Sequence, residues 1–331
     1  MPELYDVAAI GNAIVDVIAP ASDAFLTENG LTKGAMMLVD PQASATLYSK
    51  MAQAVEASGG SAANTVAGLA SFGGKGAFMG KVADDHLGRV FAHDMRAIGA
   101  RFENTPLVGG PATAVSMINV TPDAQRTMCT FLGASVEFTD TDVDEETVQA
   151  SKVVYLEGYL FDAEAARRAF AKAAAFAHGA GRKIALTLSD SFVVERHRGG
   201  LKGFIENQVD ILFANEAELL ALYETADFDE ACEQLLRHCD LAAVTRSEKG
   251  SIVLSKGETL HIAAEPVEKV VDTTGAGDQY AAGFLFGLSQ GRSLHDCGRL
   301  ASIAAAEVIS HYGPRPQVSL KDLAASKGLE G

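Results

Sequence analysis

Residues 270–291 read VVDTTGAGDQYAAGFLFGLSQG, a short β-branched run followed by a glycine turn, an acid and an apolar segment. Within the apolar segment, Tyr280, Phe284 and Leu288 recur every four residues, which predicts a helix with one buried face. Gly291 then provides a stop for that helix. The stretch therefore predicts a strand-like run, a tight turn and a helix.

The turn before this helix consists of the small residues Gly275, Ala276 and Gly277, whose backbone N–H groups can converge on one point. A helix N-terminus carries partial positive charge and binds anions such as phosphate. Asp278 follows in the first turn, where a carboxylate beside a bound phosphate can act as a base. The alternative is that Asp278 only complements the helix dipole. The stretch is thus a candidate phosphate-transfer site.

The composition limits the classes of protein to which this chain can belong. With 331 residues it is long enough for about two domains, or for one α/β domain with an appendage. Hydrophobic residues make up 48% and charged residues 21%, which is typical of a soluble α/β enzyme. The formal charge of −16 disfavours nucleic acid and anionic membranes as partners. Backbone amides can still bind a small anion in such an acidic protein.

The cysteines and the N-terminus indicate the compartment. The chain has no CxxC pair and no histidine spacing typical of zinc sites, so we expect its cysteines to be reduced and mostly structural: Cys129, Cys232, Cys239 and Cys297. The N-terminus lacks a secretory signal pattern, and no apolar run reaches the roughly 18 residues of a membrane span. We therefore expect a cytoplasmic protein.

Two polar residues near the N-terminus are candidates for substrate contact. Residues 5–11 form an apolar run that ends before Asn12, and apolar residues continue around Asp16. We expect a first buried strand with polar residues at its end. Ligands of open α/β sheets gather at the carboxyl ends of strands, which favours a substrate role for both side chains. A turn-capping pair is the alternative.

A glycine pair precedes the next predicted helix, residues 62–72. Gly60 lets a ligand approach the backbone closely, and Asn64 in the first turn can both donate to and accept from hydroxyl groups. An unliganded glycine turn is the alternative.

Two strand-like segments, residues 34–40 and 112–132, interrupt the strand–helix alternation, the second as a hairpin around residues 121–123. We expect a small β lid, built from about residues 16–40 and 108–136, that covers the site. Arg126 in this lid is a candidate to meet a transferring phosphate, with an exposed hairpin arginine as the alternative.

From residue 152 the strand–helix alternation returns, with a helix expected near residues 201–206, and predicts a parallel sheet. Asn215 and Glu218 follow the strand at 211–214 and read as an N-cap and a first-turn acid. A second role for Glu218 is to hold Mg²⁺ through water.

Two further places are candidates for nucleotide contact. Thr245 and Gly250 bound a short polar loop between two strands, although a plain hairpin turn explains that loop equally well. Ser302 belongs to an alanine-rich helix at 299–310, which could present a flat wall to a purine or serve only helix packing.

The motifs in their chain order resemble one known family. A P-loop motif is absent, and no GxGxxG follows the first strand, which disfavours P-loop kinases and dinucleotide folds. The order AIGNAIVD, SGGSAANTVAGLASFGG, NEAE, VTRSEKG and DTTGAGDQYAAGF resembles the ribokinase-like (PfkB-type) carbohydrate kinases over nearly the whole chain. This resemblance implies a three-layer α/β/α sandwich with a mainly parallel central sheet and a small β lid, in a single domain over residues 1–331.

The resemblance also implies a chemistry: ATP-dependent transfer of the γ-phosphoryl group to a primary alcohol. It implies ATP and Mg²⁺ as cofactors, leaves the need for a monovalent cation open, and is compatible with a monomer or a lid-mediated homodimer. The implied roles are base for Asp278; anion hole for Gly275, Ala276 and Gly277; grip on hydroxyl groups for Asp16, Asn12, Gly60 and Asn64; metal and phosphate motif for Asn215 and Glu218; and nucleotide loop for Thr245 and Gly250.

Within the family, GNAIVD and the lid strand with Arg126 look closer to adenosine kinases than to ribokinase or fructokinase, which favours an adenosine-like nucleoside as acceptor. Phe131, Tyr159 and Phe161 could stack a base or pack in the core. A kinase for a ribose- or fructose-type sugar is the second hypothesis. A non-catalytic nucleoside or sugar sensor is the third, although pure binding needs no base at Asp278.

Overall fold

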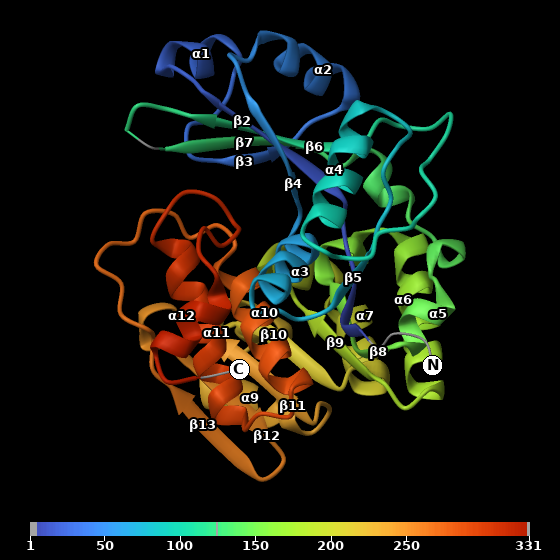
Figure 1. The fold of residues 1–331 in the computed structure, drawn as a ribbon, viewed down its shortest axis with the longest axis vertical. Helices are drawn as coiled ribbons and strands as arrows, with labels where there is room; N and C mark the ends of the chain where they lie inside the picture. Colours follow the sequence, from blue (N-terminus) through green and yellow to red (C-terminus); the bar gives the residue numbers. More distant parts are fainter. Residues whose placement is uncertain (1–4, 124, 330–331) are drawn as a thin grey trace.

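The protein, described here by a computed structural model over residues 5–123 and 125–329, contains two β-sheets, one above the other in Figure 1. The larger, central sheet has eight strands in the order β13-β12-β11-β10-β9-β8-β1-β5. These strands are β1 (Tyr5–Ile10), β5 (Gly76–Met79), β8 (Ser151–Glu157), β9 (Lys183–Thr187), β10 (Ile211–Asn215), β11 (Leu241–Thr245), β12 (Ser251–Ser255) and β13 (Glu258–Ile262).

The central sheet is parallel from β5 through β11, and β12 and β13 add an antiparallel edge. Its inner strands are nearly continuous apolar runs because both faces of the sheet are covered. Side chains of β8 alternate between the two faces: Val153 and Tyr155 join one apolar core, and Val154 and Leu156 join the other.

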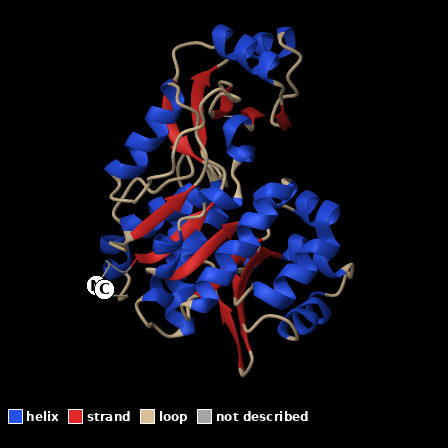
Figure 2. Ribbon diagram, turned by 90° about the vertical axis from the view of Figure 1, so that its right-hand side faces the viewer, coloured by secondary structure: helices blue, strands red, loops and turns tan. Residues whose placement is uncertain are grey.

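Helices cover both faces of the central sheet, so the molecule has the three layers expected from the sequence (Figure 2). One face carries α5 (Glu145–Gln149), α6 (Glu164–Gly179), α7 (Ser191–Gln208), α8 (Glu216–Tyr223) and α9 (Phe228–Leu236). The other carries α3 (Ser61–Ser71), α4 (His86–Ala97), α10 (Ala276–Ser289) and α11 (Leu294–Ile309), and α12 (Leu320–Ser326) packs beside α11.

The predicted helix at 201–206 is only part of α7, which has 18 residues and a non-helical residue, His197, where two helical segments join. The four cysteines are free and buried. No helix in the described ranges combines the length and the apolar character needed to cross a bilayer.

The small sheet has five strands in the order β3-β7-β6-β2-β4. They are β2 (Ile14–Pro20), β3 (Met36–Leu38), β4 (Val55–Gly59), β6 (Ala114–Val120) and β7 (Arg126–Phe131), and α1 (Asp23–Glu28) and α2 (Pro41–Lys50) lie on its outer side (Figure 1). β6 and β7 form the predicted antiparallel hairpin. The small sheet also contains β4, which lies outside residues 16–40 and 108–136, the ranges predicted for the β lid.

The chain passes from one sheet to the other directly after β1. Residues 14–20 form the separate strand β2 of the small sheet. The prediction that Asp16 lies at the end of the first strand is therefore wrong, because Asp16 lies within β2. The crossing occurs at Gly11, where a Cβ atom would overlap Glu157 and Ala62. The apolar pattern through both strands hides this change of sheet because each strand has a buried face.

Candidate active site

The N-terminus of α10 is built on a glycine turn. Gly275 has φ 79°, a left-handed conformation that favours glycine, and a Cβ there would lie 2.6 Å from Pro314 Cα. The N–H of Ala276 donates to Thr273 O at 3.2 Å. The N–H groups of Gly277 and Asp278, in the first helical turn, have no acceptor within the helix. The N–H of Ala276 is thus occupied, and the N–H groups of Gly277 and Asp278 remain available to an anion.

The carboxylate of Asp278 is held by α3. Ser61 Oγ donates to its Oδ1 at 2.6 Å, and Asn64 Nδ2 donates to its Oδ2 at 3.1 Å. Burial raises the pKa of Asp278, and the hydrogen bonds and the charge of Arg315 oppose that rise. The structure thus places the predicted substrate residue Asn64 against the predicted base Asp278. It adds Ser61 to the site, and the position of Ser61 at a glycine-rich helix start was the signal in the sequence.

The amide of Asn64 is engaged on both sides by the protein. Its Nδ2 contacts Asp278, and its Oδ1 accepts a hydrogen bond of 3.2 Å from Arg315 Nε. The predicted contact of Asn64 with substrate hydroxyls would therefore have to share or replace these two hydrogen bonds. Arg315 lies 251 residues from Asn64, in no motif of the sequence.

Asp16 projects from β2 against the backbone of Gly59, where a Cβ atom would overlap its carboxylate. Within the described residues, its carboxylate accepts no hydrogen bond. Burial raises the pKa of Asp16 to about 6, opposed by Arg315 and Arg126 and reinforced by Asp278. Asp16, on strand β2 of the small sheet, and Asp278, in the first turn of α10, therefore share one electrostatic environment.

Glu157, at the end of β8, ties the first strand to α3. Its Oε1 accepts from Asn12 Nδ2 at 2.8 Å and Asn12 N at 3.3 Å, and its Oε2 accepts from Ala62 N at 2.9 Å. Burial raises the pKa of Glu157 to about 7. The side-chain amide of Asn12 therefore donates to Glu157, while its buried Oδ1 has no hydrogen-bond partner among the described residues. An acid that ends an apolar strand was the overlooked signal.

Gly60 lies beside this junction with φ 92°, and a Cβ there would overlap Asn12 O. A glycine is required at position 60 because a larger residue would overlap that backbone atom, and because this residue precedes α3 with a positive φ.

Arg126 links the small sheet to the loop before α10. Its Nη1 lies 2.7 Å from Asp272 Oδ2, with both side chains about 10% exposed or less. Its guanidinium also lies 5.2 Å from the ring centroid of Tyr312. The alternative of an exposed hairpin arginine is wrong. To meet a phosphate, Arg126 would have to exchange Asp272 for it.

Asn215 and Glu218 form a reciprocal capping box at the start of α8. Glu218 N donates to Asn215 Oδ1 at 2.8 Å, and the two oxygens of Glu218 accept from Asn215 N at 2.9 Å and Asn215 Nδ2 at 2.7 Å. Burial raises the pKa of Glu218 to about 7. The predicted N-cap is confirmed. Across residues 5–123 and 125–329, no cluster of three or more His, Cys, Asp or Glu side chains could hold a metal.

Two of the three residues proposed to contact the nucleotide, Gly250 and Ser302, have local structural explanations. Gly250 has φ 84°, and a Cβ there would overlap Ile262 O, so the plain turn between antiparallel strands accounts for it. Thr245 ends β11. Ser302 Oγ donates to Ala263 O at 3.0 Å and accepts from Glu265 N at 2.9 Å, so its hydroxyl is occupied by the backbone after β13.

Of the aromatic residues proposed to stack a base, Phe161 is 3% exposed and packs in the core with Phe170 and Phe204. Tyr159 is 36% exposed, in an acidic environment that includes Asp278. Phe131 lies on β7 with intermediate exposure.

The family model for pfkB family carbohydrate kinases matches residues 30–320. The chain belongs to this family. Its members are phosphotransferases that use ATP and act on hydroxyl groups of sugars or nucleosides.

The proteins similar to this kinase include enzymes named for nucleosides and enzymes named for sugars. The chain is 55% identical to the adenosine kinase of Sinorhizobium meliloti, with a TM-score of 0.89 over 98% of this chain and 99% of that one. It is 49% identical to a protein of Rhizobium etli CFN 42 described as a probable sugar kinase, with a TM-score of 0.91 over 99% of both chains. It is 26% identical over 264 residues to the 5-dehydro-2-deoxygluconokinase of Halalkalibacterium halodurans, covering 77% of this chain and 80% of the relative.

Proposed function

We propose that this kinase transfers the γ-phosphoryl group of ATP to a primary hydroxyl of a nucleoside, with adenosine-like compounds as the preferred acceptors. The observation that carries the proposal is the joint placement of Asp278, at the amide-rich start of α10, and Asp16, on the small sheet. The 55% identity to an adenosine kinase supports the nucleoside acceptor.

In the proposed reaction, the acceptor oxygen forms a bond to the γ-phosphorus as the bond from that phosphorus to the β–γ bridging oxygen breaks. The hydroxyl proton passes to Asp278, and ADP leaves. Asp278 is suited to this role because Ser61 and Asn64 fix both of its oxygens, while its raised pKa increases its affinity for the proton. The free N–H groups of the first α10 turn stabilise negative charge on the transferring group.

Asp16 would hold the acceptor. Its carboxylate accepts no hydrogen bond from the described residues and is close enough to Asp278 for the two charges to interact, so it can accept hydrogen bonds from two adjacent hydroxyls of a ribose. The neighbouring guanidiniums of Arg126 and Arg315 favour its ionised form.

Mg²⁺, when bound, would neutralise charge on the nucleotide phosphates. Glu218 only partly fits the predicted role of holding Mg²⁺ through a water molecule, because its two oxygens already accept hydrogen bonds from Asn215. Asn215 and Glu218 would then act mainly by holding the start of α8 in place.

The test is an ADP-release assay with ATP and Mg²⁺ and a panel of purine nucleosides, pyrimidine nucleosides, ribose and fructose. We expect turnover with adenosine or a close analogue and weak or no turnover with free sugars. Turnover of sugars alone would establish the second candidate function, a sugar kinase, which the Rhizobium etli and Halalkalibacterium halodurans relatives support. Binding of a nucleoside or sugar without turnover of any acceptor would favour the sensor hypothesis.

A further inference from the structure

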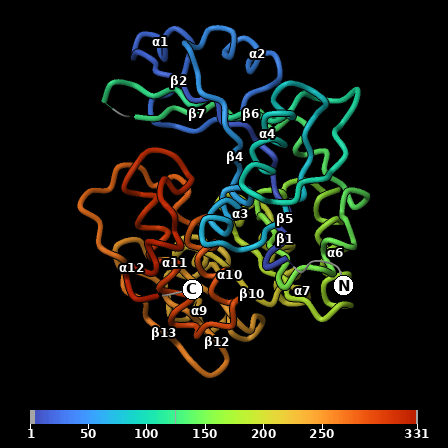
Figure 3. The backbone as a smooth tube through the Cα atoms, viewed as in Figure 1, coloured from blue at the N-terminus to red at the C-terminus, as the bar shows by residue number. Residues whose placement is uncertain are grey.

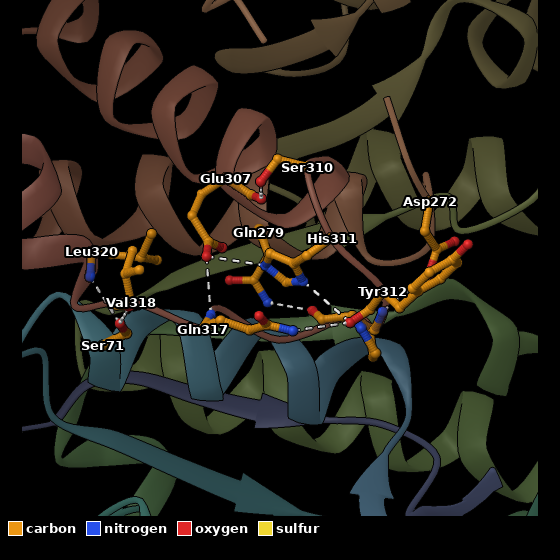
Figure 4. A network of polar contacts seen from close by, with 12 residues as sticks. Ser71, Asp272, Gln279, Glu307, Ser310, His311, Tyr312, Gln317, Val318 and Leu320 are labelled. Atoms are coloured by element: carbon orange, nitrogen blue, oxygen red, sulfur yellow. Dashed lines mark hydrogen bonds and ion pairs between the residues drawn. The ribbon is translucent and has the colours of Figure 1, made fainter. Parts of the chain in front are cut away.

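The segment after α11, residues 310–319, is anchored at both ends against the body of the protein (Figure 4). Glu307 Oε1 lies 3.0 Å from His311 Nε2 and accepts from Gln317 N at 3.0 Å. Further along, Ser71 Oγ donates to Val318 O at 3.2 Å and accepts from Leu320 N at 3.0 Å. The segment is therefore held as a fixed wall of the site.

The centre of this segment packs on the first turn of α10. Gln279, fully buried, donates to Pro314 O at 2.9 Å and to Asn64 O at 3.0 Å. Pro314 also fills the space beside Gly275. Arg315 follows between Pro314 and Pro316, which restrict the backbone on both sides of it. In Figure 3 the segment, in red, lies on the side of the body that faces the small sheet.

The side chain of Arg315 reaches from this wall to Asn64, which reaches on to Asp278. Only one orientation of the Asn64 amide suits both neighbours, because its oxygen must face the guanidinium and its nitrogen the carboxylate. Within the described residues, Arg315 has no carboxylate within 4.0 Å, so its contact with Asp278 runs through Asn64. Its Nη2 lies 4.0 Å from Met95 Sδ.

Several charged and titratable groups on other elements surround Arg315 and Asp278. Burial lowers the pKa of Arg315, and the nearby carboxylates oppose that change. The groups are Asp16 on β2, Asp94 on α4, Arg126 on β7, Tyr155 and Glu157 on β8, and Tyr159 after β8. Carboxylates outnumber guanidiniums in this set, so the removal of one positive charge has a large effect on the rest.

We propose that Arg315 is a positioning residue for phosphoryl transfer, which orients the Asn64 amide toward Asp278 and supplies the positive charge that Asp278 and Asp16 share. This inference rests on the proposed kinase reaction at Asp278. Arg315 acts on the base through Asn64 and through its charge, and it needs no contact with the transferring group.

The test compares Arg315→Met, which removes the charge, with Arg315→Lys, which keeps it. We expect Arg315→Met to lower kcat about tenfold and to move the acidic limb of the kcat/KM profile upward by roughly one pH unit. Arg315→Lys should move that limb less. Arg198→Met is the control, since Arg198 pairs with Glu224 and Ala221 O away from the site. An unchanged acidic limb in Arg315→Met would overturn the inference, whatever its thermal stability.

A second measurement does not depend on turnover. Infrared titration of the carboxyl groups, with Asp278→Asn to assign the Asp278 band, should show a higher pKa for Asp278 in Arg315→Met than in the wild type. An unchanged Asp278 titration also overturns the inference. If the wild type phosphorylates no acceptor, the proposed function fails, and this titration still decides whether Arg315 acts on Asp278. If Arg315→Met does not fold, Arg315→Lys against the wild type gives both comparisons, with a smaller shift expected.

Discussion

The two carboxylates at the centre of the site are held in different ways. Asp278, in the body, accepts hydrogen bonds of 2.6 and 3.1 Å from two side chains of α3. Asp16, in the small sheet, accepts none from the described residues and is balanced only by the charges of Arg126 and Arg315. Burial nevertheless raises the pKa of both groups.

The difference suggests a division of work. A base must be fixed before the acceptor arrives, because proton transfer depends on its orientation. A group that grips the acceptor must keep free lone pairs for hydroxyl groups. Asp278 has the first arrangement and Asp16 the second, so loss of each should produce a different kinetic defect.

The largest effect is expected for Asp278→Asn. The asparagine is close in shape and can still accept from Ser61, but it cannot take the proton, so kcat should fall by about 10²–10⁴-fold. ADP release measures turnover, and calorimetry should show nearly unchanged acceptor binding. Comparable turnover in the variant would remove the assignment of Asp278 as the base.

Asp16→Asn should mainly weaken recognition of the acceptor. We expect kcat/KM to fall about 10–100-fold for the preferred acceptor, and much less for an analogue that lacks one vicinal hydroxyl. The control is Asp23→Asn, an exposed acid of the same part of the chain, with a side chain 69% exposed. An equal loss for both acceptors would show that Asp16 does not grip the hydroxyl pair.

Glu157→Gln tests the hydrogen bonds by which Glu157 joins Asn12 to the start of α3. Its amide nitrogen would face a backbone donor such as Ala62 N, so we expect the free energy of unfolding in urea to fall by about 1–3 kcal/mol. The wild-type carboxyl has a pKa raised to about 7 from 4.5, so its contribution to stability is complete below about pH 4.5 and declines as the pH rises to about 7. The deficit of the variant should therefore shrink over that window. A deficit that grows with pH would show that Glu157 has the opposite pKa shift.

Arg126→Lys should have the smallest effect. The lysine keeps the charge beside Asp272 and Asp16 but loses the planar contact with Tyr312, so we expect about a threefold rise in the KM for the acceptor. A fall in kcat of more than about 100-fold would instead support the hypothesis that Arg126 meets the transferring phosphate.

Much of the fold and part of the site could be predicted from short segments. The helix after Gly275, the cap at Asn215 and the hairpin of β6 and β7 depend on residues close in sequence. Glycine conformations, caps and apolar periodicity act over a few residues, so the sequence displays them directly. The sequence analysis began the lid near residue 16, whereas β2 begins at Ile14, because an apolar strand pattern does not state which sheet a strand joins.

By itself, the sequence determined the three-layer fold, the family and the position of Asp278 at the start of a helix. Only the tertiary structure decided that Ser61 and Asn64 hold Asp278, that Glu157 joins Asn12 to α3, and that Arg126 pairs with Asp272. The structure also brought Arg315 to this centre, across 251 residues of chain from Asn64. The physical reason is that side-chain partners at such separations depend on how helices and loops pack, and no local pattern records that packing.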